Sequence, residues 1–523
     1  MAPTVSDAPI PGTSAADALD GPGIAAIVDG HLLRASPRPV RRAAVDSRRV
    51  EPGMVFVALP GEHTDGHRFL ADAVARGAAA LLVTSDLPDR DLDALSVGSP
   101  GDRDAVAGLH DPGAAGAAVL DDGQRGCSIV RVDDGLRALQ RLASAWRGRF
   151  DPLVVGITGS VAKTSTKEAT ATVLAQARRV LRSEGNENNE IGLPLTLLRL
   201  ERGHEVAVLE MGMYVPGEIA QLAAMARPSI GIVTAVRGVH LERAGSIDAI
   251  EQGKGQLVEA LPETGTAILN ADDFRVRRMD ARTRARVLTY GFDAGADVSA
   301  TDVTSVGLDG MRFSLRLPGS SAPLRVTSPV LGRHAVHNGL AAAAAGVAAG
   351  LAASDIVAGL GRGWAAPHRD EVRRIGEWTA IDDTYNAGPD SMAAALDLLA
   401  TLPGRRIAVL GEMLELGPES EALHRSVGTG AARSVDLLIP LGEGARPIVD
   451  GALAAGIAPE RVRALPDFDA ALEVLPTLLR SGDIVLFKAS RGLGMDPRER
   501  ARRGLGLDDL LDALAASSAG ATA

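Results

Sequence analysis

Cysteine is almost absent from this sequence of 523 residues, which contains only Cys127. A single thiol excludes an intrachain disulfide framework and a cysteine-rich zinc site. Aromatic residues are also scarce, at 3%, whereas there are 59 glycines. Small side chains in place of aromatic ones suit helices that pack closely on a sheet. A hydrophobic fraction of 46% with 23% charged residues indicates a folded rather than a disordered chain.

No segment has the pattern of a membrane span or a secretory signal. The most apolar stretch, residues 340–353, falls short of the ~20 residues that cross a bilayer. Residues 1–14 lack both a basic and an apolar region, so they are no signal peptide. A formal net charge of -11 argues against nonspecific binding to nucleic acid or an anionic membrane. We therefore expect a cytoplasmic enzyme that binds no nucleic acid and inserts into no membrane.

Short apolar runs alternate with longer helical patterns, which predicts an α/β fold with mostly parallel sheets. The expected strands are residues 55–59, 79–83, 153–157, 206–209, 230–236, 267–269, 407–410, 437–441 and 484–487. Alternating polarity within residues 298–330 predicts an antiparallel section. At roughly 100–200 residues per domain, we expect three domains. They would comprise residues 1–150, with a surface insertion at about 96–126, residues 151–366 and residues 367–523.

The strand at residues 153–157 runs into Thr158-Gly-Ser-Val-Ala-Lys-Thr-Ser165, which resembles a phosphate-binding loop. In such loops, backbone N–H groups cradle phosphates, and here Lys163 could reach the β- and γ-phosphates while Thr164 ligates Mg²⁺. Ala162 stands where glycine usually precedes the lysine, and we expect a helical φ there. The alternative is an ordinary strand–turn–helix with a surface lysine.

Further polar residues follow neighbouring strands, at the edge where open α/β sheets bind ligands. Glu210 could hold Mg²⁺, or it could be a capping or salt-bridged glutamate. His240 is either a metal ligand or a structural histidine, and Lys254, on a predicted helix, is by itself more often solvated. Asn270 ends another strand. Their order and their placement at strand ends together predict one nucleotide site in the second domain.

Motifs in order across all three domains resemble those of the Mur ligase family. In the second domain they are Thr158 to Ser165, Glu184-Gly-Asn-Glu-Asn-Asn-Glu-Ile-Gly-Leu-Pro194, Leu209-Glu-Met-Gly212, His240-Leu-Glu, Lys254-Gly, Leu269-Asn-Ala-Asp-Asp273 and Gly332-Arg-His-Ala-Val-His-Asn338. The third domain has Asp382-Asp-Thr-Tyr-Asn-Ala387, Leu410-Gly-Glu-Met-Leu-Glu-Leu-Gly417 and Lys488-Ala-Ser-Arg491, and the first has Val45-Asp-Ser-Arg48 and Gly53 to Glu62. The Asn-x-Asn-Asn-x-Ile-Gly-x-Pro element is similar to that of the MurF type. The resemblance covers nearly the whole chain, outside the insertion and the termini.

The resemblance implies a role for each matching residue. The catalytic residues would be Lys163, Glu210, His240, Lys254 and Arg369. ATP would contact Thr158, Gly159, Ser160, Val161, Ala162, Lys163, Thr164, Ser165, Asn270, Asn338, Arg369 and Asp383. Thr164 and Glu210 would hold one Mg²⁺, and His240 with a carbamylated Lys254 a second, because a carbamate offers anionic oxygens in place of a cationic amine. Substrates would contact Ser47, Arg48, Asn186, Asn189, Tyr385 and Asn386.

The resemblance also implies what each domain does. A first domain would bind a UDP-linked precursor, a central P-loop-type ATPase domain would bind ATP, and a Rossmann-like C-terminal domain would bind the incoming dipeptide. The implied enzyme is an ADP-forming ligase that joins D-alanyl-D-alanine to UDP-N-acetylmuramoyl-tripeptide through an acyl phosphate. It would act in cytoplasmic peptidoglycan synthesis, and so in cell wall biogenesis, cell shape and cell division, as a monomer. The alternatives are another Mur-family amide ligase with a different acceptor and a non-catalytic homologue that binds nucleotide or precursor.

Four positions depart from the family's pattern. They are Ala162, Ala335 in place of an asparagine, His368 in place of a glycine before Arg369, and Gly388 in place of an asparagine. None of them removes a metal ligand or the phosphate lysine, so we expect an active enzyme.

Overall fold

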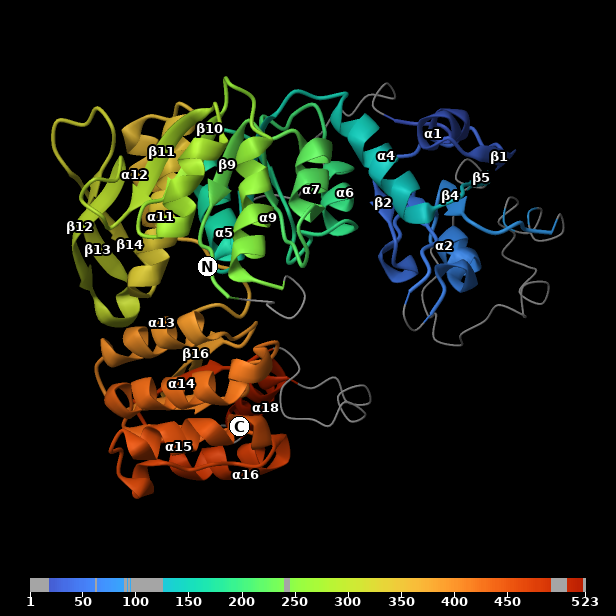
Figure 1. The fold of residues 1–523 in the computed structure, drawn as a ribbon. Helices are drawn as coiled ribbons and strands as arrows, with labels where there is room; N and C mark the ends of the chain where they lie inside the picture. The colour runs from blue at the N-terminus through green and yellow to red at the C-terminus, as the bar shows by residue number, and fades with distance from the viewer. Residues whose placement is uncertain are drawn as a thin grey trace.

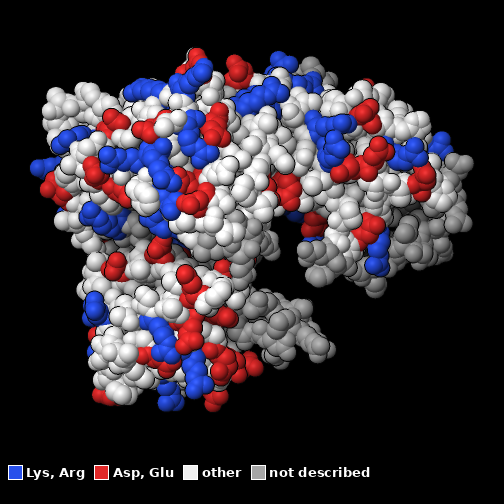
Figure 2. Space-filling model, viewed as in Figure 1, with Lys and Arg blue, Asp and Glu red and all other residues white. Residues whose placement is uncertain are grey.

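The computed structural model describes residues 18–61, 64–88, 92, 95, 126–238, 245–490 and 506–520. It has a mixed α/β fold with three sheet-containing domains, which confirms the predicted fold class. The central domain (green to yellow in Figure 1) lies between the first domain (blue) and the third (orange to red). On the face drawn in Figure 2, an open notch separates the first and third domains.

The first domain has a five-stranded sheet with the order β1-β5-β4-β3-β2, parallel except for β1. Its elements are α1 (Gly21–Val28), β1 (His31–Arg34), β2 (Ala43–Ala44), β3 (Val55–Val57), α2 (Leu70–Ala75), β4 (Ala80–Val83), β5 (Ser128–Arg131) and α4 (Gly135–Arg147). The two predicted strands are present, each slightly shorter than predicted. The predicted insertion at 96–126 lies outside the described residues except for Gly126.

The central domain has a nine-stranded sheet with the order β14-β13-β12-β11-β10-β9-β6-β8-β7. Its elements are β6 (Leu153–Thr158), α5 (Lys163–Leu174), β7 (Val180–Arg182), α6 (Gly192–Leu197), β8 (Val206–Glu210), α7 (Glu218–Ala226), β9 (Ile230–Val233), α9 (Ile247–Glu259), β10 (Thr266–Asn270), α10 (Phe274–Arg277), β11 (Arg286–Gly291), β12 (Val298–Ser305), β13 (Met311–Arg316), β14 (Leu324–Ser328), α11 (Gly332–Ala348) and α12 (Ala353–Arg362). The strands from β7 to β12 are parallel, and β12 to β14 form the predicted antiparallel section.

One predicted strand of this sheet is too long. Residues 230–236 were expected to be extended, but β9 ends at Val233. The following backbone turns toward the loop after β6, because the N–H of Thr234 donates to the carbonyl of Thr158 and the N–H of Ser160 donates to the carbonyl of Ala235. The residues after Val233 therefore form hydrogen bonds with the loop after β6 and do not extend β9.

Helices cover both faces of the central sheet. Val155 and Val208 face a core that also contains α5, α11 and α12, whereas Val154 and Leu209 face a second core with α7 and part of α9. This alternation is the two-residue period of buried strands. Five consecutive alanines of α11, Ala341 to Ala345, are fully buried against the first of these faces. No described helix has the length and apolar character needed to span a membrane.

The third domain has a five-stranded sheet with the order β15-β16-β19-β17-β18, parallel except for the edge strand β15. Its elements are β15 (Glu371–Ile375), β16 (Trp378–Asp383), α13 (Pro389–Ala400), β17 (Arg406–Leu410), α14 (Ser420–Ser434), β18 (Leu437–Pro440), α15 (Arg446–Ala454), α16 (Phe468–Leu478), β19 (Ile484–Lys488) and α18 (Leu507–Gly520). All three strands predicted here are present. The exact domain boundaries, at residues 150/151 and 366/367, stay a prediction.

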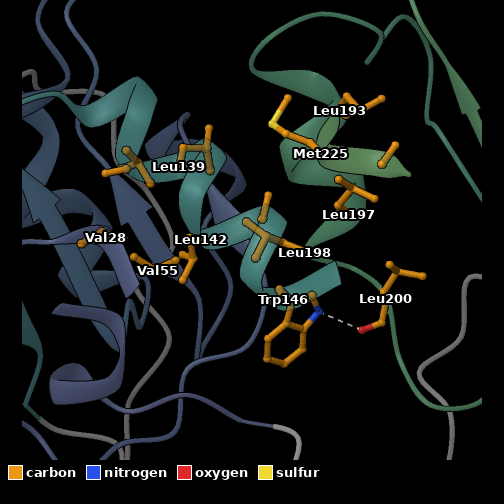
Figure 3. Packing of buried hydrophobic residues seen from close by; sticks show 14 of the residues in the cluster. Val28, Val55, Leu139, Leu142, Trp146, Leu193, Leu197, Leu198, Leu200 and Met225 are labelled. Carbon is orange, nitrogen blue, oxygen red and sulfur yellow. Dashed lines mark hydrogen bonds between the residues drawn. The ribbon is translucent and has the colours of Figure 1, made fainter. Parts of the chain in front are cut away.

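The first and central domains share one apolar core. Leu139 and Leu142 of α4 pack in the same cluster as Leu193 and Leu197 of α6, and the indole N–H of Trp146 donates to the carbonyl of Leu200 at 3.0 Å (Figure 3). A continuous hydrophobic joint of this kind resists relative motion, unlike a polar one. The two domains therefore form a common platform for the third.

Candidate functional site

The loop between β6 and α5 is tied to the residues after β9. Gly159 has a φ of 154°, and a Cβ there would lie 1.8 Å from the Thr234 hydroxyl, so only glycine fits. Ser160 Oγ accepts a hydrogen bond from the N–H of Arg237 at 2.9 Å and donates to the carbonyl of Arg237 at 3.0 Å. The loop is thus held in shape before any ligand binds.

Ala162 corrects one expectation of the sequence analysis. Its φ is 66°, in the left-handed region, and not the right-handed helical value expected. This conformation favours glycine, the residue usual in such loops, because the alanine methyl crowds the backbone there. The predicted loop from Thr158 to Ser165 is otherwise formed as expected, with α5 starting at Lys163.

Lys163 lies at the centre of the site. Its ammonium donates to the carbonyl of Gly159 at 2.8 Å. Burial lowers the pKa of Lys163; the charge of Glu210 opposes this shift and that of Arg369 adds to it. The two neighbours come from β8 and from the third domain, so the structure brings three predicted catalytic residues within electrostatic range of one another.

Glu210 has the environment of a metal ligand. Its side chain is buried, and Oε1 accepts a hydrogen bond from Asn188 Nδ2 at 2.8 Å, but Oε2 is buried without a partner in the described part of the chain. An orphaned carboxylate oxygen is costly unless a cation or a donor completes it. Thr164 is also buried at the start of α5. One carboxylate oxygen and one hydroxyl beside a phosphate loop fit Mg²⁺, which prefers oxygen ligands and phosphate.

Lys254 lies on α9 and is 4% exposed. Among the described residues it has no hydrogen bond or ion pair. Burial, and then the charge of Lys163, lower the pKa of its amine well below the ordinary value. The solvated lysine considered from the sequence is therefore wrong. His240, the other predicted ligand of a second metal, lies outside the described residues.

The two asparagines predicted to contact ATP differ in their surroundings. Asn270 donates to the carbonyl of Thr234 at 2.7 Å and accepts from the N–H of Asp272 at 2.9 Å, so its amide braces the loops beside the site. Asn338 is buried on α11, and its amide makes no hydrogen bond within the described residues. A buried amide with free donors and an acceptor is suited to reading the edge of a base.

Residues of the third domain face the site from its other side. The guanidinium of Arg369 lies over the ring of Tyr385, 4.3 Å from its centroid, and its buried Nε has no described partner. Asp383 is paired with Lys488 at 2.5 Å, and Lys488 also donates to the carbonyl of Asn386 at 3.0 Å. Burial raises the pKa of the Asp383 carboxyl to about 6, although Lys488 opposes the shift.

Four of the six predicted substrate residues lie on either side of the joint between the first and central domains. Ser47 is buried, whereas Arg48 is exposed and forms an ion pair with Asp46 at 2.7 Å. Asn186 is exposed. Asn189 accepts from the N–H of Gly192 at 2.9 Å and so caps the start of α6.

Sequence reasoning assigned no role to three residues that shape the site: Asn188, Lys488 and Arg237. Asn188 belongs to the Asn-Glu-Asn-Asn element, but its contact with Glu210 depends on how that loop folds. Lys488 ends a predicted strand, and a cation at a strand end was a usable signal. Arg237 also forms an ion pair with Asp273 and another with Asp390 of the third domain.

A loop with the form of a phosphate-binding loop, beside a carboxylate with one unsatisfied oxygen, is what phosphoryl transfer from a nucleotide requires, so the site defines the class of P-loop enzymes. Comparison with known proteins narrows the class. Residues 157–346 match the Mur ligase middle domain, residues 368–491 match the Mur ligase glutamate ligase domain, and residues 40–96 match the Mur ligase family catalytic domain. The chain belongs to the Mur ligase family, whose members are ATP-dependent amide ligases.

Curated relatives and solved structures agree on the branch of that family. The chain is 38% identical over 508 residues to the UDP-N-acetylmuramoyl-tripeptide–D-alanyl-D-alanine ligase of Mycobacterium tuberculosis, covering 90% of this chain and 95% of the relative. The Escherichia coli enzyme of the same name is 35% identical, covering 87% and 92%. Crystal structure I of MurF from Acinetobacter baumannii matches with a TM-score of 0.75 at 27% identity, covering 91% and 96%. MurF ligase from Thermotoga maritima in complex with ADP matches with a TM-score of 0.72 at 26% identity, covering 92% and 98%.

Proposed function

We propose that this ligase joins the amine of D-alanyl-D-alanine to the terminal carboxylate of UDP-N-acetylmuramoyl-tripeptide in the cytoplasm. The observation that carries the proposal is the orphaned Oε2 of Glu210 beside Lys163, in a chain whose relatives bear the name of this activity. In the first step, a carboxylate oxygen attacks the γ-phosphorus of ATP. This forms an acyl phosphate and displaces ADP. In the second step, the dipeptide nitrogen attacks the acyl carbon, loses a proton and displaces phosphate.

The chain's own residues neutralise charge and position the reactants. Both reactants of the first step are anionic, so the barrier falls mainly through positive charge placed around the phosphates. The ammonium of Lys163, the N–H groups that open α5 and the guanidinium of Arg369 supply it. Thr164 and Glu210 would hold Mg²⁺, which supplies further positive charge to the phosphate oxygens when bound. Approach of the third domain would exclude water from the acyl phosphate.

A carbamylated Lys254 is part of the proposal. Burial lowers the pKa of the Lys254 amine and so favours its neutral form, and a neutral amine adds to carbon dioxide, forming a C–N bond and releasing a proton. The resulting carbamate oxygens, together with His240, would hold a second Mg²⁺. Such a cation would also offset the free-energy cost of burying the negatively charged carbamate at this position.

The remaining contacts follow from the domain that carries each residue. We assign residues 1–150 to the UDP-precursor, with Ser47 and Arg48 as contacts, residues 151–366 to ATP, with Asn270 and Asn338, and residues 367–523 to the dipeptide. Asn186 and Asn189 would line the path of the acceptor peptide, Asp383 would reach the nucleotide, and Tyr385 and Asn386 would meet the dipeptide. The chain would act as a monomer.

The experiment that tests the proposal is phosphate release from ATP and Mg²⁺ with UDP-N-acetylmuramoyl-tripeptide, with and without D-alanyl-D-alanine. Release that needs both substrates and yields the pentapeptide precursor supports the assignment. Release with single amino acids or with a shorter muramoyl peptide would favour a sister ligase. Intact ATP binding without release would favour a non-catalytic homologue.

A further inference from the structure

Three consecutive residues, His368, Arg369 and Asp370, join the central domain to the third. The side chains that flank Arg369 reach in opposite directions. His368 Nδ1 lies 3.0 Å from Oδ2 of Asp382, a fully buried residue of β16 in the third domain. Asp370 Oδ2 lies 2.8 Å from Nε2 of His334 on α11 in the central domain. One flanking residue is thus anchored in each domain.

The backbone of this segment is in a conformation that L-residues rarely adopt. His368 has a φ of 57° and Asp370 a φ of 49°, both in the left-handed region. Such torsions persist in a structure only where the surroundings hold them, and they gather at functional sites. Here the N–H of Arg369 donates to the carbonyl of Ala366, and the N–H of Tyr385 donates to the carbonyl of His368. The two side-chain anchors complete this support.

The supported geometry sets the direction of Arg369. Its guanidinium is stacked on Tyr385, its Nε is buried without a described partner, and its charge is felt by Lys163 of the phosphate loop. Asp370 Oδ1 is also buried without a partner in the described residues. A guanidinium that is stacked on an aromatic ring and keeps one N–H donor unused is well placed to bind an anionic ligand.

We propose that Asp370 and His334 are positioning residues, a clamp across the junction that orients Arg369 toward the ATP phosphates. The inference rests on the proposed function, because it assigns Arg369 to the phosphates. α11 carries both His334 and Asn338, the residue assigned to adenine. The clamp therefore couples the helix that holds the base to the arginine that meets the phosphates.

The charge state of the clamp gives it a signature that packing alone would not have. Burial opposes the charge on His334, but Asp370 and then Asp383 raise its pKa, while Lys488 lowers it. Asp370, Asp383 and Lys488 all belong to the third domain, so the charge on this imidazole depends on how that domain is placed. Removing the charge of Asp370 should therefore lower the pKa of His334. Any part of the pH–rate profile that depends on the protonation of His334 should then move to lower pH.

The test compares kcat and the KM for ATP in Asp370→Asn, Asp370→Ala and His334→Gln, with Asp397→Asn as control. Asp397 is exposed on α13 of the same domain and makes no described side-chain bond. We expect Asp370→Ala to lower kcat about 10- to 100-fold with the KM for ATP changed by less than about threefold, as for a misplaced catalytic group. Asp370→Asn, which keeps the shape of the carboxylate, should retain more activity and shift the pH profile. His334→Gln combined with Asp370→Ala should be no worse than the poorer single variant.

Two controls keep this inference separate from the proposed function. The unaltered chain must first release phosphate only with both substrates; failure there overturns the proposed function itself. If Arg369→Ala is inactive while the Asp370 variants match Asp397→Asn in kcat and in pH profile, the clamp is wrong and the function stands. Thermal unfolding of each variant, in the full chain, identifies any loss of activity that comes from misfolding, and Asp370→Asn then decides the question.

Discussion

Arg237 Nε in the loop after β9 lies 3.1 Å from Oδ2 of Asp390 in the first turn of α13. The same arginine is bonded through its backbone to Ser160 of the phosphate loop. The two side chains are 43% and 56% exposed, so solvent screens the pair and its effect on overall stability is small. Its position matters more than its strength, because it links the phosphate loop directly to the third domain.

Arg237→Gln and Asp390→Asn should each weaken the docking of the third domain. We expect the KM for the dipeptide to rise about two- to fivefold, with kcat nearly unchanged, since an exposed pair contributes at most about 1 kcal/mol. Steady-state kinetics at low and high ionic strength measures the effect, which should shrink with salt. Arg362→Gln, which replaces an exposed arginine at the end of α12 in the central domain without a described partner, is the control. Additive effects in the double variant would show that the two residues act separately.

The contact between Asn188 and Glu210 predicts a defect that is specific to the metal. Asn188→Ala removes the donor to Oε1 and leaves the carboxylate free to turn. Loss of such a supporting hydrogen bond costs about 10- to 100-fold in metal affinity. A Mg²⁺ titration of ATP turnover should show this shift, with activity partly restored at saturating Mg²⁺.

Asn186→Ala in the same loop is the matched comparison. Asn186 makes no described side-chain bond to Glu210 and is exposed, so its replacement should alter the KM for the UDP-precursor and leave the Mg²⁺ dependence as it was. Equal shifts in the two Mg²⁺ titrations would mean that the hydrogen bond from Asn188 does not orient the Glu210 carboxylate for the metal ion.

Ala162→Gly should stabilise the protein and leave turnover within about tenfold. The φ of 66° costs an alanine about 1 kcal/mol that a glycine does not incur. Denaturant unfolding measures the gain in free energy. Ala171→Gly, at a fully buried position within α5, should have the opposite sign, because a glycine there loses helix propensity and packing. A gain in turnover much above tenfold would mean that the alanine impairs the natural enzyme.

The three sheets could be predicted because the signals for them are local. Buried parallel strands are continuous apolar runs, and polar residues that follow them, such as Lys163 and Glu210, meet at one edge of the sheet. The end of β9 could not be predicted, since the bond between Ser160 and Ala235 that turns the backbone is a tertiary contact. The apolar pattern of residues 230–236 carries no trace of it.

The details of the site were harder to predict for the same reason. The φ of Ala162 is imposed by a loop fastened to other segments, not by the residue's own preference. Lys488 and Asp383 lie 105 residues apart in the sequence, so their pairing needs the third sheet to exist. The burial of Lys254 follows from the packing of α9, and its helical spacing gave no warning that the amine would lack a partner.

Lys254→Ala should lose most activity and recover part of it with added short-chain carboxylates. Such acids offer the oxygens that a carbamate would have presented to a metal ion. The lowered pKa of the amine, caused by burial and then by Lys163, favours the neutral form, which is the form that reacts with carbon dioxide. Initial rates with and without propionate test the rescue of the variant. Incorporation of isotope-labelled bicarbonate into the unaltered chain tests whether the lysine is carbamylated.

Lys163→Ala serves as the comparison, because a lost cation cannot be replaced by a carboxylate. It should stay inactive at every propionate concentration. A fully active Lys254→Ala variant would remove the metal role from this lysine, and rescue of both variants alike would make the effect of propionate nonspecific.

His368 should make the stability of the protein depend on pH. Burial opposes the charge on its imidazole, but the hydrogen bond to Asp382 and the charge of that carboxylate raise its pKa above the ordinary value. A raised folded-state pKa means that the native protein binds the proton more tightly than the unfolded chain does. The stabilisation is therefore complete below the unfolded value of about 6.5 and is lost as the pH rises through the raised value.

His368→Asn tests this point without disturbing the backbone, since asparagine tolerates the left-handed φ of 57°. The difference in unfolding free energy between the unaltered chain and this variant should be largest in mild acid and should shrink toward neutral and basic pH. Urea unfolding across that range measures it. His31→Asn, which replaces an exposed histidine of β1, is the control for the substitution itself. A difference for His368→Asn that stays constant across this pH range would mean that the imidazole supports the junction by packing and not by its charge.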